Sequence, residues 1–226
     1  MNGEARQLPL DFILPRRRAR GRDGFFVSAS NRDALAMIDG WRDWPDARFC
    51  LLGPEGAGKT HLAHVWMEEA GAEAVSAATL SVEDAPTLVA GGAVVVEDVD
   101  RIAPEAEAAL FHLINLAKAE GAHLLLTGRG APKDWRIATP DLASRLRGTA
   151  TVSLAPPDDA LMADLLASHL SARHLTVARD VVEYLALRID RSAAAVADAA
   201  ETLDRAALAE KRAITKPFAR KALDLP

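Results

Sequence analysis

Cysteine is nearly absent from this chain, which has one, Cys50, among 226 residues. A single cysteine cannot form a disulfide within the chain, and this suits a reducing compartment. Cys50 lies in an apolar run, where a small buried core residue is expected. No apolar run approaches the roughly 18 residues that a membrane span needs, and the N-terminus lacks the hydrophobic core of a secretory signal. We therefore expect a cytoplasmic protein without membrane contact.

An excess of positive charge is also lacking. The chain has 27 lysines and arginines against 32 aspartates and glutamates, which gives a net charge of −5. This balance argues against bulk attraction to nucleic acid, so any DNA contact would be weak or indirect, through a local patch. Half of the residues are apolar. The chain can therefore bury a core and is not a disordered protein.

A glycine-rich loop follows a short apolar run and precedes a segment without helix breakers. Residues 53–60 have the sequence GPEGAGKT, which matches the phosphate-binding pattern G-x-x-x-x-G-K-T. In that pattern the backbone N–H groups turn toward phosphate, the lysine reaches the β- and γ-phosphates, and the threonine hydroxyl ligates Mg²⁺. Because strand, loop and helix occur in the required order, a phosphate site at a helix N-terminus is favoured over a chance glycine-rich turn. The expected nucleotide contacts are Gly56, Ala57, Gly58, Lys59, Thr60 and His61.

Strand-like segments alternate with helical ones after this loop. Together with the apolar run before the loop, they predict five strands. The four later segments are residues 73–77, 93–98, 122–127 and 151–154. Continuous apolar strands between helices are typical of a parallel sheet that is buried on both faces, so we predict an α/β fold.

Two acidic residues end the strand at 93–98, as in a Walker B element beside a phosphate-binding loop. Glu97 would hold the Mg²⁺ shell together with Thr60, and Asp98 would orient the attacking water. The usual order places aspartate first, and the reversed order shifts both carboxylates by about one methylene, so we expect intrinsic hydrolysis to be weak. Thr127, at the end of the next strand, is expected to bond the phosphate or its water.

Arg145 lies in the segment 140–147, just before the last strand. In assemblies of P-loop domains, an arginine at this position projects to the γ-phosphate of a neighbour and stabilises charge in the transition state. The alternative is a surface arginine that pairs with Asp141. The sequence alone leaves both interpretations open.

Residues 23–31 precede the strand of the phosphate-binding loop, where a domain could wrap an adenine base. Phe26 and Val27 would then make apolar contacts with the base, and Asn31 would be a helix cap or a base contact. A simple packing segment is the alternative.

Residues 1–22 have no helical or strand period and predict a flexible tail. In an extended peptide, alternate side chains point to one side, so Leu8, Leu10 and Phe12 could fill pockets on another protein while Gln7 orients the peptide. A tail that folds back on its own domain is the alternative. The arginine cluster at 16–22 is more typical of a solvated linker than of a DNA-binding arm.

Pro156-Pro157 marks a boundary, after which four helical stretches are expected at 158–174, 179–189, 192–211 and 215–223. We therefore divide the chain into a tail at 1–22, a nucleotide-binding α/β domain at 23–155 and a small helical lid at 156–226. The lid is assigned no chemistry.

With these motifs in order, the chain resembles AAA+ ATPases of the DnaA clade, and within it the Hda group of DnaA-related regulators. The resemblance covers essentially the whole chain. The matching residues are Phe26-Val27 with Ser30-Asn31, the segment 142–146 (LASRL), the segment 203–206 (LDRA), and the peptide 7–12 (QLPLDF), which is similar to the sliding-clamp-binding peptide of bacterial replication proteins.

The resemblance implies an AAA+ P-loop domain followed by a helical lid, with ADP or ATP and Mg²⁺ as cofactors. It further implies a clamp-bound negative regulator of replication initiation whose arginine, Arg145 here, completes the hydrolysis site of ATP-bound DnaA. Members of this group are thought to work best with ADP, so that Lys59 and Thr60 would serve assembly more than turnover. The sequence departs from related ATPases in the lid, where alanine stands at the sensor-arginine position, Ala194, and Arg191 lies about one turn away. We expect this loss to weaken discrimination between ATP and ADP.

Other functions remain to be weighed against this one. An initiator is disfavoured, since only residues 81–92 separate the second and third strands and no helix-turn-helix domain follows the lid in this sequence. An autonomous AAA+ ATPase that acts on single-stranded DNA, of the helicase-loader type, is the main alternative. A small-molecule P-loop kinase fits less well, because no substrate lid with arginines is evident. The sequence leaves open whether two copies form a homodimer.

Overall fold

A parallel five-stranded sheet forms the centre of the larger part of the molecule. The computed structural model describes residues 25–226. The strand order is β2-β3-β4-β1-β5, and every pairing is parallel, as the sequence predicted. The strands are β1 (Arg48–Leu52), β2 (Glu73–Ser76), β3 (Ala93–Glu97), β4 (His123–Gly128) and β5 (Ala150–Ser153).

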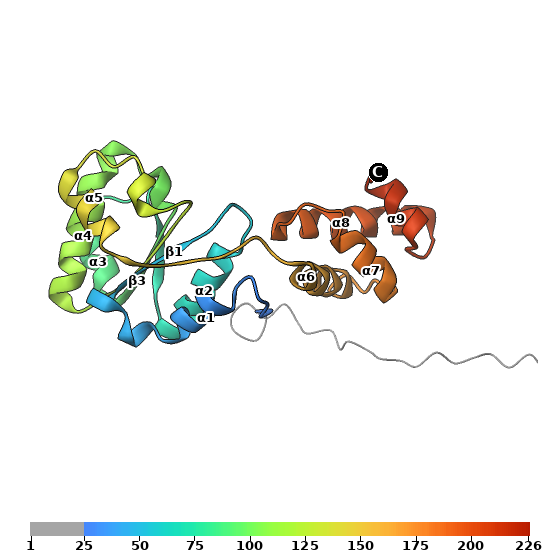
Figure 1. The fold of residues 1–226 in the computed structure, drawn as a ribbon, viewed down its shortest axis with the longest axis horizontal. Helices are drawn as coiled ribbons and strands as arrows, with labels where there is room; N and C mark the ends of the chain where they lie inside the picture. The colour runs from blue at the N-terminus through green and yellow to red at the C-terminus, as the bar shows by residue number, and fades with distance from the viewer. Residues whose placement is uncertain (1–24) are drawn as a thin grey trace, which may run out of the picture.

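Five helices cover the two faces of this sheet (Figure 1). They are α1 (Arg32–Asp39), α2 (Lys59–Ala70), α3 (Ala85–Ala90), α4 (Glu107–Glu120) and α5 (Pro140–Arg147). Successive strand residues point to opposite faces, so Val95 packs with α1 and α2 while Val94 and Val96 pack with α3, α4 and α5. This burial on both faces explains why the strands are continuous apolar runs. The short helix α3 lies in a segment to which the sequence analysis assigned no element.

The register of the sheet brings three strand ends to one edge. Leu52 of β1 pairs with Gly128 of β4, and Val96 of β3 pairs with Leu126 of β4. The carboxyl ends of β1, β3 and β4 therefore meet, and the loop after β1, the acids after β3 and the turn after β4 lie together. In open α/β sheets, ligands bind outside the carboxyl ends of the strands.

Four helices form a second unit with its own core. They are α6 (Asp159–Ser171), α7 (Arg179–Ala186), α8 (Ala193–Glu210) and α9 (Lys216–Ala222). The side chains of Asp158, Ser192 and Thr215 cap α6, α8 and α9 by accepting from backbone N–H groups three residues on. Its core runs from Met162 to Ala219, while the cores on the sheet end at Leu154, so the predicted boundary at residue 156 falls between them.

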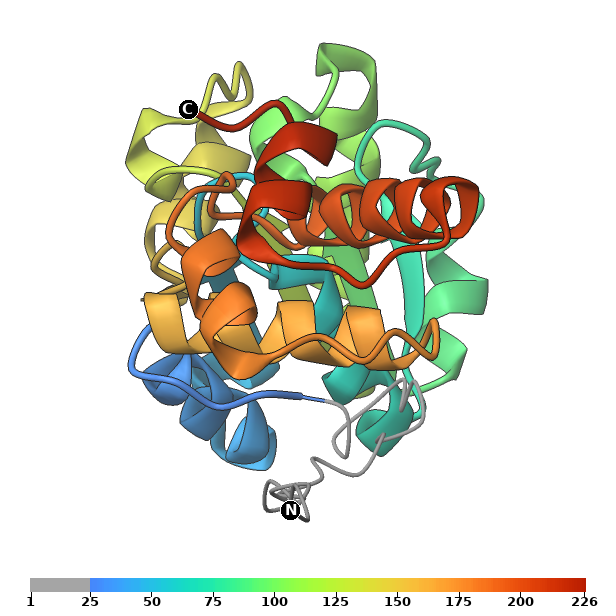
Figure 2. The same ribbon diagram turned by 90° about the vertical axis from the view of Figure 1, so that its right-hand side faces the viewer.

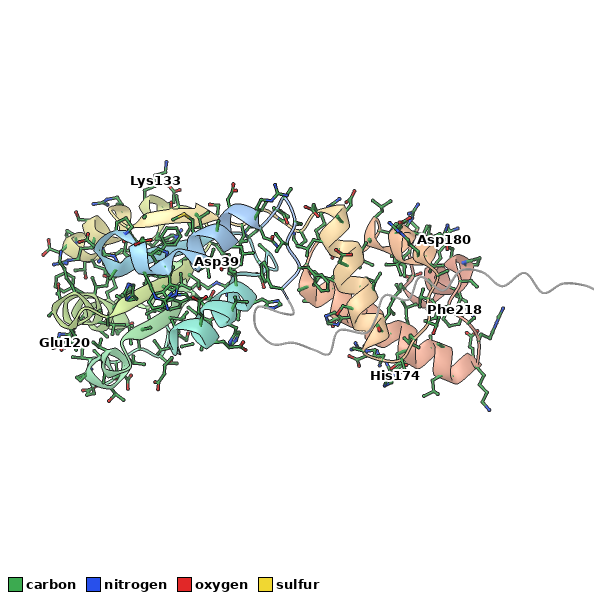
Figure 3. The ribbon with its side chains drawn as sticks, turned by 90° about the horizontal axis from the view of Figure 1, so that it is seen from below. Asp39, Glu120, Lys133, His174, Asp180 and Phe218 are labelled. Carbon is green, nitrogen blue, oxygen red and sulfur yellow. The ribbon has the colours of Figure 1, made fainter. Side chains whose placement is uncertain are left out.

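The helical unit lies at one end of the molecule and α5 at the other (Figure 1). Viewed from the end of the helical unit, helices α6 to α9 lie in front of the sheet (Figure 2). Seen from below, the labelled residues Asp39, Glu120 and Lys133 mark the α/β unit and His174, Asp180 and Phe218 mark the helical unit (Figure 3). None of the helices between residues 25 and 226 combines the length and the apolar character that a membrane crossing requires.

Hydrogen bonds around Asp158 join the two units. Asp158 Oδ1 accepts from Leu161 N at 2.8 Å, and its Oδ2 accepts from Ser30 N at 3.4 Å. The backbone N–H of Ala155 also donates to Ser30 O at 3.1 Å. Hydrogen bonds to the Asp158 carboxylate, first of all the one from Leu161 N, lower the pKa of this group below its ordinary value. The segment before α1 is thus tied to the start of the helical unit.

Candidate nucleotide site

The loop between β1 and α2 depends on glycine at two positions. Gly58 has a φ of 97° and ends the loop in the left-handed region, where α2 begins. Gly56 has a φ of 75°, and a Cβ there would lie 2.4 Å from Cβ of Ser192, the residue that caps α8. The loop therefore lies directly against the start of α8.

Lys59 is folded back onto its own loop. Its Nζ donates to Gly53 O at 2.8 Å and to Pro54 O at 2.9 Å, and the residue is 9% exposed. Burial lowers the pKa of Lys59, and the nearby carboxylate of Asp98 partly opposes that shift. A buried ammonium held only by neutral carbonyls gains from an anion within reach. The glycine backbone, the helix N-terminus and this cation together fit a phosphate group.

The polar residues at the ends of β3 and β4 lie together as expected. Thr127 is 1% exposed, and its Oγ1 accepts from the backbone N–H of Asp98 at 3.1 Å, which leaves the hydroxyl proton available to a ligand. Asp98 has a φ of 58°, and its side chain is exposed. Glu97 is the last residue of β3 and is half-buried. The structure brings Lys59, Asp98 and Thr127 to one edge, and their catalytic roles stay predictions.

A metal site is not complete within the protein. Nowhere between residues 25 and 226 do three carboxylate, imidazole or thiol groups converge where they could hold a metal ion. Magnesium in nucleotide sites is commonly held by one or two protein ligands together with phosphate oxygens and water. Thr60 and Glu97 would therefore need such partners, and the metal site stays a prediction.

Asn31 organises the segment that precedes α1 and does not cap that helix with its side chain. Its Nδ2 donates to Phe26 O at 2.8 Å, and its Oδ1 accepts from Ser28 N at 2.9 Å. Asn31 is 5% exposed, whereas Val27 is 55% exposed. Asn31 therefore occupies the N-cap position of α1, but its carboxamide folds residues 26–28, and its contact with a base stays a prediction.

Phe25 was not singled out in the sequence, yet it contacts the start of α2. Its ring meets the ring of His61 edge-on, with centroids 5.4 Å apart. This contact holds the start of the described chain beside the N-terminal turn of the helix that follows the phosphate-binding loop. An isolated phenylalanine before a predicted helix carries no signal of such a contact.

Arg129, two residues after Thr127, contacts carboxylates of two other loops. Its Nη1 lies 2.7 Å from Oε2 of Glu55 in the phosphate-binding loop, and its Nε lies 3.7 Å from Oδ2 of Asp100. Oδ1 of Asp100 is buried without a hydrogen-bond partner among the residues that the structure describes. The Arg129 guanidinium thus links three loops at the carboxyl edge. This contact follows from the strand register, and no local motif predicts it.

Arg191 is engaged with the start of the helical unit. Its Nη1 donates to Pro157 O at 3.0 Å, and its Nη2 forms an ion pair with Asp159. Ala194 lies in the first turn of α8, close to Ser192 and the phosphate-binding loop. The first turn of α8 therefore brings no arginine to the loop, since its residues are alanines.

Arg145 lies at the opposite edge of the sheet. Its guanidinium carbon is 4.9 Å from the ring centroid of Phe111 in α4, and its backbone oxygen accepts from the hydroxyl of Thr149 at 2.9 Å. The same hydroxyl accepts from Nε of Arg48, the first residue of β1. The phosphate-binding loop follows the last residue of β1, four steps of about 3.3 Å or roughly 13 Å away. No ion pair joins Arg145 to Asp141 or to another carboxylate within the described residues, so the alternative pairing is not formed.

Known structures share this architecture over most of the chain. Domain III of the Thermotoga maritima replication initiation protein DnaA matches with a TM-score of 0.74 at 16% identity, over 92% of this chain and 97% of that one. AMPPCP-bound DnaA from Aquifex aeolicus matches with a TM-score of 0.67 at 18% identity, over 82% of this chain and 65% of that one. The Thermotoga maritima RuvB branch migration motor matches with a TM-score of 0.70 at 17% identity, over 92% and 72%. The shared fold is that of AAA+ domains.

The helical unit carries a more specific likeness. Residues 159–223 match the family model described as the lid domain of Hda. The chain is thus similar to DnaA in its fold and to Hda in its lid. The predicted α/β fold of AAA+ type, followed by a helical lid, is confirmed. The clamp-type residues Gln7, Leu8, Leu10 and Phe12 and the arginine cluster at 16–22 lie outside the described residues.

Proposed function

We propose that this DnaA-related protein binds an adenine nucleotide in the loop 53–60 and restrains replication initiation by completing the ATP hydrolysis site of DnaA. Lys59 and the N–H groups of residues 56–60 would hold the phosphates, while Phe26 and Val27 would lie against the base. The nucleotide would supply the charge that fixes the loop against α8, and Mg²⁺, with Thr60 and Glu97, would help to neutralise the phosphates. AMPPCP-bound DnaA with the same fold supports this role for the loop.

The observation that carries the regulatory part is the position of Arg145. It lies at the amino edge of the sheet, away from the phosphate-binding loop, and no carboxylate of the described residues neutralises it. A guanidinium stacked on an aromatic face keeps its N–H donors free at its edge. Such a group is suited to an anion on another molecule, where it would stabilise the charge that develops on a transferring phosphoryl group. Intrinsic hydrolysis would then be of minor importance.

A clamp-binding peptide would concentrate this activity at replicating DNA. Gln7, Leu8, Leu10 and Phe12 carry the side chains for that contact, and tethering raises the effective concentration of the regulator near its partner. The Leu10→Ala, Phe12→Ala double variant should lose binding to the sliding clamp in a pull-down or a surface binding assay. Wild-type affinity in this variant would remove the clamp from the proposal.

The decisive test measures ATP hydrolysis by DnaA in the presence of this protein and of clamps loaded on DNA. We expect Arg145→Ala to reduce the stimulated rate by about 1000-fold, the lower range for loss of an arginine supplied in trans. Arg147→Ala is the matched control, because Arg147 lies exposed in the same last turn of α5. If Arg145→Ala keeps the stimulation while Lys59→Ala abolishes an intrinsic, DNA-stimulated ATPase, a helicase-loader type of function replaces this one.

A further inference from the structure

The guanidinium of Arg129 lies over the phosphate-binding loop. It contacts Glu55, which stands between the loop glycines 53 and 56, with 2.7 Å between Nη1 and Oε2. A longer contact of 3.7 Å joins Nε to Asp100 after β3. These partners come from two different loops at the carboxyl edge, so the position of the guanidinium is defined by the sheet and not by its own loop alone.

The turn after β4 is built to hold Arg129 in this place. Trp135 packs so closely on Gly128 that a Cβ at residue 128 would lie 2.4 Å from the indole ring. The indole Nε1 also donates to the backbone oxygen of Arg129 at 2.6 Å. The backbone on both sides of the Gly128–Arg129 peptide bond is therefore fixed, and the side chain leaves it in the direction of Glu55.

Two cations consequently face the same loop. Arg129 contacts Glu55 of this loop, and Nζ of Lys59 donates to the carbonyls of Gly53 and Pro54 in the same loop. Like charges near each other favour an anion that both can reach. At the same time, the first turn of α8 brings only alanines toward this loop, including Ala194.

We propose that Arg129 is a phosphate-binding residue which leaves Glu55 and pairs with the terminal phosphate of a bound nucleoside triphosphate. This inference rests on the proposed binding of nucleotide to the loop 53–60. Arg129 would thus supply from within the chain the cation that the start of α8 lacks. Glu55 is then a competitor that occupies the guanidinium until a phosphate arrives.

The exposure of the two side chains explains why phosphate can displace the carboxylate. The side chain of Glu55 is 78% exposed, whereas that of Arg129 is 30% exposed. An ion pair with a largely solvated carboxylate is weak. A phosphate beside Lys59 offers several charged oxygens in the geometry that guanidinium binds through two parallel hydrogen bonds.

Calorimetric titration with ATP and with ADP tests the proposal through the opposite signs of two substitutions. Arg129→Ala should weaken ATP binding about tenfold and ADP binding much less, the loss expected for one charged pair. Glu55→Ala should strengthen ATP binding by about threefold, because the competitor is gone. Arg136→Ala, which removes an exposed arginine farther along the same loop, should change neither affinity.

A purely structural ion pair gives a different result. If Arg129 and Glu55 only brace the loop, both substitutions weaken ATP and ADP binding alike, and the inference is overturned. Unchanged affinities for Arg129→Ala overturn it as well, while wild-type binding of ATP keeps the proposed function intact. If the wild type binds neither nucleotide, the proposed function fails first. Arg129→Lys, which keeps the charge but not the paired donors, should recover only part of the affinity.

Discussion

The two edges of the parallel sheet hold their cations in different ways. At the carboxyl edge, Lys59 donates to two loop carbonyls and Arg129 contacts two carboxylates. At the amino edge, Arg145 rests on the ring of Phe111, without a carboxylate among the described residues. The cations of the first edge are held by the loops that surround the predicted phosphate site. The cation of the second edge is held by a neutral surface.

The difference between the two edges shows how one chain can present a cation to another molecule. A cation–π contact at a partly exposed site contributes about 0.5–1 kcal/mol, so a guanidinium can exchange it for a phosphate at little cost. At the carboxyl edge, Lys59 and Arg129 are instead held among the loops that surround the predicted phosphate site. The amino edge is therefore suited to an anion on another molecule, and the carboxyl edge is suited to a nucleotide that this chain binds. Substitutions that change one edge and leave the other intact test this difference.

The largest effect on nucleotide binding is expected at Lys59. Lys59→Ala should weaken binding of ADP and ATP about 100-fold, since it removes a charged donor from a buried phosphate site. Lys133→Ala, a charge change at an exposed residue on the same unit (Figure 3), is the control and should bind nucleotide normally. Isothermal titration calorimetry measures both. Equal affinities for the two variants would show that the carboxyl edge is not the phosphate site.

The next effect concerns the anchor of α5. Glu107 is 2% exposed, and its carboxylate accepts from Ala138 N at 2.8 Å and from Thr139 N at 2.7 Å, just before α5 begins. Glu107→Ala leaves these two donors without their acceptor, and we expect the free energy of unfolding to fall by about 2 kcal/mol. Urea denaturation followed by circular dichroism measures it. Glu105→Ala, an exposed carboxylate in the preceding turn, should change it by less than about 0.5 kcal/mol.

The same carboxylate predicts a dependence on pH. Burial raises the pKa of Glu107, but the hydrogen bonds from Ala138 and Thr139 together lower it by a larger amount, so the pKa lies below its ordinary value. A carboxyl whose pKa is lowered on folding stabilises the protein above its unfolded pKa, and this contribution is lost as the pH falls through the folded pKa. Glu107→Gln should therefore lose less stability than the wild type between about pH 5 and pH 3. A steeper loss in the variant would contradict the hydrogen-bonded carboxylate.

Most of the fold and part of the site could be predicted from the sequence, for local reasons. The loop 53–60 has a spacing that fixes its chemistry, and the runs at 93–98 and 122–127 are too apolar for any but buried strands. The contact between Arg129 and Glu55 depends on the pairing of β1 with β4 and on the turn held by Trp135. The backbone donors to the Glu107 carboxylate lie 31 and 32 residues along the chain. No local pattern encodes such partners, so long-range contacts had to come from the structure.

Asn31 lies at the predicted N-cap position of α1, but the use of its side chain was not evident from the sequence. Asparagine before a helical segment is typical of an N-cap, yet its carboxamide folds residues 26–28 instead. Capping the helix and folding residues 26–28 both satisfy backbone groups near the start of α1. The structure shows the second use, in the segment whose Phe25 packs beside His61. Asn31 thus shapes the segment that contains the expected base contacts Phe26 and Val27.

The smallest effect is expected for a substitution that changes the support of the Arg145 guanidinium and leaves its charge intact. Phe111→Leu keeps an apolar side chain of similar bulk on α4 but removes the aromatic face beneath the guanidinium. We expect stimulation of DnaA to fall about fivefold, equivalent to about 1 kcal/mol, with nucleotide affinity unchanged because the carboxyl edge is intact. Phe111→Tyr retains the ring and should restore the stimulation. If the leucine and tyrosine variants stimulate equally, the ring does not position Arg145, and the contrast between the two edges reduces to the presence or absence of carboxylates.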